Sequence, residues 1–263
     1  MRYRVERLTL VLAAGMVAAW MADGSEWRAA SALGGDKKAQ EIVRVRVVPQ
    51  ERMAALSAKS GTIELEYLMP ALKVAGRPAG LAETGQTSLI LGNAPQVGDP
   101  GKPVLPVVPC YVAIPKGKAM DTIQVECGRR VDLPGRHAIR HGEKAIPLVP
   151  GAKAEPVDPD PVVYGSDEPW PGKRYEYVTV QKKRGATVLV VNLNPVVYRP
   201  KSGRVSYYPS MRLKVKTRAA LPREQSTAAY RPDRIRPVSE QVDNPETLKT
   251  YKANPERVMR KEK

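Results

Sequence analysis

The sequence lacks phenylalanine altogether and has only two histidines and two cysteines among its 263 residues. The histidines, His137 and His141, have the spacing of a helical metal-binding pair, but Pro134-Gly135 directly before them indicates a loop. No cysteine or carboxylate cluster completes a zinc set. The sequence also contains no G-x-S-x-G element, no phosphate-binding glycine loop and no calcium-loop pattern. We therefore expect no metal and no cofactor.

Long apolar runs are equally scarce. The one candidate, Leu8–Ala22, has 15 residues and is short for a membrane span, but it follows Arg2, Arg4 and Arg7 and precedes small residues. This pattern predicts a secretion signal over residues 1–32, cleaved after Gly24 or after Ala32; an uncleaved N-terminal anchor is the alternative. No second apolar span follows. We therefore expect a secreted, cell-surface or periplasmic chain without a membrane span once the signal is removed.

Acidic residues are in the minority: the chain has 43 lysines and arginines but 27 aspartates and glutamates, which gives a formal net charge of +16. The basic residues are spread along the chain. The sequence has no arginine-rich arm, no zinc-finger spacing and no glycine-aromatic RNA-binding motif, which argues against a nucleic-acid partner. An anionic surface or an acidic partner remains compatible with this charge.

Turn residues are abundant: 25 prolines and 20 glycines favour short strands joined by tight turns. Met211, Leu213 and Val215 alternate with basic residues, which is the period of a half-buried strand, whereas Val188–Val191 is a continuous apolar run. Further strands are expected at Ile42–Val48, Ile63–Tyr67, Thr87–Leu91 and Tyr175–Val180, and in a hairpin of Val107–Ile114 and Met120–Glu126. We predict an all-β fold, a β-sandwich of short antiparallel strands over residues 40–217, with an N-terminal signal helix and a short C-terminal helix.

The cysteines, Cys110 and Cys127, fall on the two strands of that predicted hairpin. Two cysteines in an exported protein usually pair, and a disulfide here would close a loop of about 17 residues, worth about 3 kcal/mol in the chain-entropy model. The register of the hairpin is not set by the sequence, so two free thiols are the alternative.

Two segments interrupt the strand pattern. Gly128–Lys144 is long, polar and strongly basic, and we expect an exposed loop there. Residues 218–263 are expected to form a linker and the start of a truncated following domain. Within them, Asp243-Asn244-Pro245-Glu246 predicts a helix start, because it combines a capping residue, a proline at the first helical position and an acidic first turn.

Several short motifs then occur in a characteristic order: Gly101-x-Pro103-x-Leu105-Pro106, Ile114-Pro115-x-Gly117, Tyr164 with Pro169-Trp170-Pro171, Gly185 before the apolar run, Pro195-Val196-Val197-Tyr198-Arg199-Pro200, and Gly203-x-Val205-x-Tyr207-Tyr208. This order resembles the propeptide domain of gingipain-type cysteine peptidases over roughly residues 42–217. Val242–Tyr251 is similar to the lead-in to the catalytic domain of that family.

The resemblance implies a β-sandwich that precedes a secreted peptidase, helps it fold and covers its active site until cleavage. The expected partner is a gingipain-type catalytic domain, in cis or in trans. In that family a loop offers a basic side chain to the specificity pocket. The best local candidates lie in the basic loop, as Arg129, Arg130, Arg136 or Arg140; the alternative is that these arginines form a solvated surface.

The same comparison argues against catalysis by this chain. In the gingipain-type catalytic domain a His-Gly element precedes the nucleophilic cysteine, whereas His141-Gly142 follows both cysteines here. Processing that would release the domain has five candidate sites beyond residue 217: Arg218, Arg223, Arg231, Arg234 and Arg236. The competing functional hypothesis is a stand-alone secreted module that binds cell-surface polymers.

Overall fold

The computed structural model describes residues 27–29, 43–47, 61–76, 86–146, 149, 153, 155–225, 230 and 237–251. The regular structure in this part of the chain consists mostly of antiparallel strands, which confirms the predicted fold class. The strands are β1 (Trp27–Ala29), β2 (Arg44–Val47), β3 (Gly61–Leu68), β4 (Leu72–Ala75), β5 (Ser88–Leu91), β6 (Gln96–Val97), β7 (Leu105–Pro106), β8 (Val108–Ile114), β9 (Lys118–Cys127), β10 (Val131–Asp132), β11 (Tyr175–Lys183), β12 (Ala186–Leu193), β13 (Val196–Arg199), β14 (Arg204–Tyr207) and β15 (Ser210–Ala219). The described helices are α2 (Pro161–Gly165) and the short 3₁₀ helices η1 (Pro222–Glu224), η2 (Val238–Glu240) and η3 (Pro245–Tyr251).

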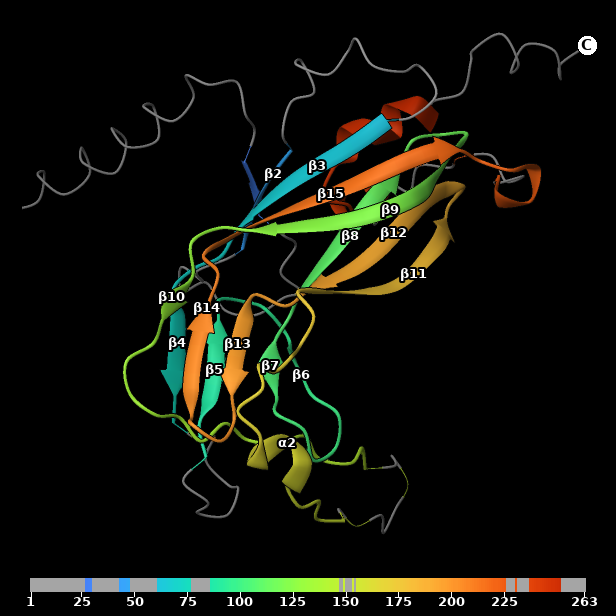
Figure 1. Cartoon of the computed structure of the whole chain (residues 1–263). Helices are drawn as coiled ribbons and strands as arrows, with labels where there is room; N and C mark the ends of the chain where they lie inside the picture. The colour runs from blue at the N-terminus through green and yellow to red at the C-terminus, as the bar shows by residue number, and fades with distance from the viewer. Residues whose placement is uncertain are drawn as a thin grey trace, which may run out of the picture.

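The larger part of the molecule is the predicted sandwich. A sheet in the order β1-β2-β3-β15-β9 packs over a three-stranded sheet in the order β11-β12-β8 (Figure 1). Successive side chains of a strand point to opposite faces, so every second residue of β3 and β15 enters the core. Leu65 and Leu213 lie opposite each other in the register and are fully buried. They meet Val112 and Leu189 of the facing sheet in one apolar cluster.

A second, smaller part, the small lobe, lies beneath the sandwich in Figure 1. It consists of the sheet β10-β14-β13, the two-stranded sheets β4-β5 and β6-β7, and helix α2. Its own apolar core contains Leu89, Leu105, Ile139, Val196, Tyr198 and Val205. Strand β7 of the small lobe is separated by one residue from β8 of the sandwich, so the chain passes directly from one part to the other.

The prediction that β8 and β9 form a hairpin is wrong. The turn itself exists, because Lys118 N–H donates to Pro115 O at 3.0 Å. However, β8 pairs with β12 while β9 pairs with β15, so the chain crosses from one sheet to the other at this turn. Proline and glycine define a tight turn but do not decide whether the two strands pair or face each other.

The structure does not contain the predicted disulfide between Cys110 and Cys127. Cys110 lies opposite Val191 in one sheet, and Cys127 lies opposite Met211 in the other. Both are free cysteines, and Cys110 is fully buried in the sandwich core. The alternative of two free thiols is the one that the structure supports.

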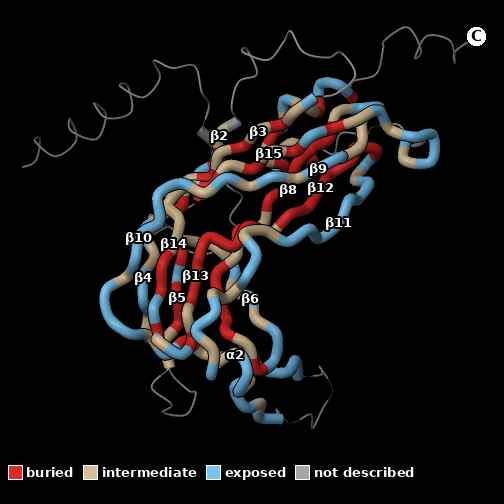
Figure 2. Tube along the Cα trace, in the orientation of Figure 1, coloured by how far each residue is buried: buried red, intermediate tan, exposed pale blue. Residues whose placement is uncertain are grey.

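The continuous apolar run of β12 has a simple explanation. One face of the strand enters the sandwich core, where Leu189, Val191 and Leu193 are buried. The other face, with Ala186 and Val188, is covered by residues 238–251, so β12 is red along most of its length in Figure 2. A strand buried on both faces needs apolar residues at consecutive positions rather than alternation.

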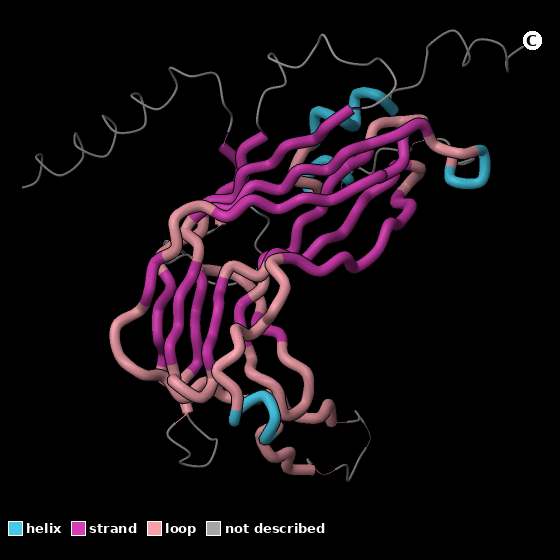
Figure 3. Tube along the Cα trace, viewed as in Figure 1, coloured by secondary structure: helices cyan, strands magenta, loops and turns pink. Residues whose placement is uncertain are grey.

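The predicted C-terminal helix is present as η3, a 3₁₀ helix, and Figure 3 shows it close to the sandwich. The domain limits 1–32, 40–217 and 218–263 stay predictions, although residues 237–251 of the third pack against the sandwich. No described helix is long and apolar enough to cross a membrane. The predicted signal run Leu8–Ala22 lies outside the described residues.

Candidate functional site

The basic segment Gly128–Lys144 is less exposed than its composition predicts. It leaves the sandwich at Gly128, whose N–H donates to Ser210 O at 2.9 Å. It then adds β10 to the edge of β14, with Val131 opposite Tyr207. Further on, Ile139 is buried in the core of the small lobe and forms a parallel bridge with Thr87. The prediction of an exposed loop is therefore wrong for its second half, because that half is fixed to the small lobe.

Two tyrosines hold this half in place. The Tyr198 hydroxyl donates to His137 O at 3.0 Å and accepts from Ile139 N–H at 3.4 Å. The Tyr164 hydroxyl donates to Ile139 O at 3.0 Å. Burial raises the pKa of both tyrosines, so both hydroxyls keep the protons that these bonds require. The sequence motifs contained both tyrosines, but nothing in the spacing indicated that they clamp this loop.

The His-Gly pair within the loop has a structural role. Gly142 approaches the backbone so closely that an added Cβ would lie 2.4 Å from Asp99 O. Its N–H donates to Lys102 O, and its carbonyl accepts from Gly101 N–H, both at 2.9 Å. The ring Nδ1 of His141 lies 3.2 Å from Gly142 O. Only glycine therefore fits at position 142. Among the described residues, no group of three or more histidine, cysteine or carboxylate side chains could hold a metal ion.

The four candidate arginines fall into two pairs. Arg136 Nε donates to Ser202 O at 2.9 Å, and Arg140 Nη2 donates to Gln96 Oε1 at 3.1 Å, so both guanidinium groups are tied to the fold. Arg129 and Arg130 follow Gly128, the first residue after β9, and are exposed. Arg130 Nε lies 3.3 Å from Asp132 Oδ1, an exposed pair of little strength. Within the described chain, Arg129 makes no hydrogen bond or ion pair and is available to a partner.

Removing the Tyr198 hydroxyl should destabilise residues 137–140 of the basic segment more than the rest of the small lobe. Tyr198→Phe keeps the buried ring but leaves His137 O and Ile139 N–H without their common partner. We expect a loss of about 1–3 kcal/mol in the free energy of unfolding, since unsatisfied buried backbone groups carry a desolvation cost. We also expect faster amide hydrogen exchange at residues 137–140. Denaturant unfolding and exchange mass spectrometry measure both, with Tyr177→Phe on the exposed face of β11 as the control; unchanged exchange would contradict the clamp.

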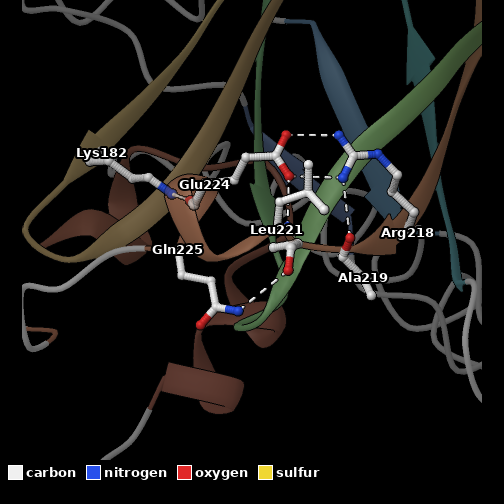
Figure 4. Close-up of polar contacts among 7 residues, drawn as sticks. Lys182, Arg218, Ala219, Leu221, Glu224 and Gln225 are labelled. Carbon is white, nitrogen blue, oxygen red and sulfur yellow. Dashed lines mark hydrogen bonds and ion pairs between the residues drawn. The ribbon is translucent and has the colours of Figure 1, made fainter.

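Of the five candidate processing arginines, the structure describes two. Arg218 belongs to β15, and its guanidinium makes a bidentate pair with Glu224 at 2.8 and 2.7 Å (Figure 4). Glu224 also accepts from Leu221 N–H at 2.8 Å, and the Arg218 hydrogen bonds lower its pKa to about 2. Arg223 is exposed in η1. Arg231, Arg234 and Arg236 lie outside the described residues.

Both cysteine thiols are in environments that disfavour the thiolate. Burial raises the pKa of Cys110 well above its ordinary value, and it also raises the pKa of half-buried Cys127. The thiolate is the nucleophilic form, so neither residue has the setting of an activated cysteine. Cys110 instead lies beside two buried polar residues, Tyr67 and Asp243. Sequence reasoning treated Asp243 only as part of a helix start and missed this contact.

Solved structures similar to this chain include gingipain structures, in agreement with the resemblance seen in the sequence motifs. No protein-family model and no curated protein matches the sequence. A solved structure of gingipain K from Porphyromonas gingivalis, described as an insight into zymogenic latency, superimposes with a TM-score of 0.51 and 14% identity, over 74% of this chain and 100% of that chain. A complex of the RgpB pro- and mature domains from the same organism gives a TM-score of 0.45 and 17% identity, over 63% of this chain and 81% of that one. The chain therefore has the fold seen in gingipain pro-domain structures, as the sequence motifs predicted.

Proposed function

We propose that this chain is a propeptide-like domain that binds the catalytic domain of a gingipain-type cysteine peptidase, assists its folding and keeps it latent by covering its active site. The observation that carries the proposal is the shared fold, which extends over the whole of the aligned gingipain K chain. The proposal's local support is an exposed basic pair, Arg129 and Arg130, presented just beyond β9.

The proposed mechanism is binding without chemistry. An arginine guanidinium is planar and can pair bidentately with a carboxylate at the base of a specificity pocket. Arg129 suits this role best, because its side chain has no partner within the described fold, while the preceding residue is fixed to the sandwich by the hydrogen bond from Gly128 N–H to Ser210 O. The setting of the two thiols supports a chain that does not itself cleave peptides. Such a chain would act outside the cytoplasm, after export by the segment at residues 1–32.

Titration of a purified gingipain-type catalytic domain with the purified chain tests the proposal. We expect inhibition that saturates at one chain per peptidase, and a higher yield of active peptidase when the denatured catalytic domain is refolded with the chain present. A papain-type cysteine peptidase serves as the control and should be unaffected. Absence of both binding and inhibition would overturn the proposal.

The net charge of +16 favours a second candidate, a stand-alone module that binds anionic cell-surface polymers. Such binding is electrostatic and should weaken steeply as salt screens the charges. Salt-sensitive retention on an anionic polymer, together with no effect on the peptidase, would favour this second function.

A further inference from the structure

Residues 238–251, which we call the clasp, pack on one side of the three-stranded sheet. The clasp contains η2 and η3, and its apolar side chains are Val238, Val242, Leu248 and Tyr251. They are between 0% and 7% exposed and form one cluster with Ala113 of β8 and with Ala186 and Val188 of β12. A surface of the sandwich is therefore buried by a segment that follows it in the chain.

The clasp also completes the sheet. Strand β8 is an edge strand, so its outward N–H and C=O groups need partners. Asp243 N–H donates to Tyr111 O, and Tyr111 N–H donates to the Asp243 carboxylate, both at 2.8 Å. Asn244 accepts from Ala113 N–H at 2.7 Å through Oδ1 and donates to Ala113 O at 2.9 Å through Nδ2. Two consecutive residues thus replace a neighbouring strand, partly with side-chain atoms.

The far end of the clasp is fixed in the same way. The Tyr251 hydroxyl donates to Ile114 O at 2.6 Å and accepts from Thr187 N–H at 3.1 Å. Lys116 N–H donates to Thr250 Oγ1 at 3.0 Å. Near the start, the Tyr67 hydroxyl donates to the Asp243 carboxylate at 2.8 Å, which connects the clasp to the opposite sheet. The clasp is therefore held by hydrogen bonds at both ends and by apolar contacts between them.

We propose that the edge of β8 and the outer face of β12 form a peptide-binding groove whose ligand is the clasp, so that the piece containing residues 238–251 stays bound after the chain is cut between residues 226 and 236. The contacts that hold the clasp are all non-covalent. Tyr230, the described residue between positions 226 and 236, adds one apolar contact, with its ring centroid 5.9 Å from that of Tyr251. A cut there removes the covalent connection and leaves the groove and its ligand intact. The proposal does not depend on the peptidase partner.

The test uses the full chain with a unique protease recognition sequence replacing residues 231–236, so that Tyr230 is kept. After complete cleavage, size-exclusion chromatography with mass spectrometry should find both pieces in one peak at micromolar concentration. In excess, a synthetic peptide of residues 238–251 should displace the bound piece. Separation of the two wild-type pieces after cleavage would overturn the proposal.

Variants of Asn244 show whether the groove contacts are responsible. Asn244→Ala removes both bonds to Ala113, and Asn244→Asp places a carboxylate oxygen against Ala113 O; each should weaken retention of the cut piece at least tenfold. Lys249→Ala is the control within the clasp: its 69% exposed side chain pairs with exposed Glu246, and its loss should leave retention within twofold of wild type. Circular dichroism of the uncut variants checks that the sandwich is folded. If the Asn244 variants keep the pieces together as well as wild type does, the groove is not the binding site and the proposal fails.

Discussion

Arg129→Ala combined with Arg130→Ala should weaken inhibition of a gingipain-type catalytic domain at least tenfold. A charge-assisted hydrogen bond to a buried carboxylate contributes about 1.5–3 kcal/mol, and 1.4 kcal/mol is already a factor of ten in affinity. The two side chains are exposed, and replacing them breaks only the weak contact of Arg130 with Asp132. The inhibition constant at fixed ionic strength is the measurement.

The matched control for this prediction is Arg136→Ala combined with Arg140→Ala. It removes the same charge from the same segment, but these guanidinium groups bond to Ser202 O and to Gln96. We expect the inhibition constant of the control to change less than threefold. A larger effect in the control pair would transfer the role to the second half of the segment. An unchanged constant in both pairs would remove the segment from the inhibitory surface.

Asp243→Asn should abolish a pH dependence of stability that the wild-type chain shows between about pH 4 and pH 6. Burial raises the pKa of this carboxyl to about 6, against the hydrogen bonds from Tyr111 N–H and the Tyr67 hydroxyl, which lower it. The other titratable groups beside it, Tyr67 and Cys110, have raised pKa values and stay neutral throughout this range. Asp243 is therefore the group in this cluster that changes charge there.

Proton linkage determines whether the free energy of unfolding rises or falls with pH. The folded state holds the Asp243 proton more tightly than the unfolded state, whose carboxyl titrates near pH 3.9. The favourable contribution is fully present below that pH and is lost as the pH rises through about 6. The wild-type free energy of unfolding should therefore fall by about 3 kcal/mol relative to the variant over this range. Urea unfolding at pH 4, 5, 6 and 7 tests this, with exposed Asp121→Asn as the control; parallel curves for wild type and Asp243→Asn would contradict the account.

The strands with a clear period were predictable from the sequence alone. In β3 and β15, alternating apolar and charged residues identify the element and the buried face, and the structure pairs these strands residue by residue. The run in β12 was also identifiable as a strand, but its cover was not. That cover depends on Asp243 and Asn244, and Asn244 contacts a residue 131 positions earlier in the chain.

The errors have equally specific causes. The turn at Pro115–Lys118 is compatible both with a hairpin and with a crossing between sheets, and the choice depends on β12 and β15, which come much later in the chain. Ile139 is a single apolar residue among polar ones and carries no periodic signal. Its side chain is buried in the apolar core of the small lobe, and the hydroxyls of Tyr164 and Tyr198 bond its backbone from distant elements. Tertiary contacts of this kind are not encoded in local spacing.

Binding to a catalytic domain whose active site is already blocked tests the central claim most directly. The peptidase is labelled on its catalytic cysteine with a covalent inhibitor that fills the specificity pocket, and binding of the chain is measured by calorimetry for labelled and unlabelled peptidase. If the chain covers the active site through a basic side chain in that pocket, labelling should weaken binding at least tenfold. Equal affinity for both forms would show that the chain binds elsewhere and would contradict the proposed latency mechanism.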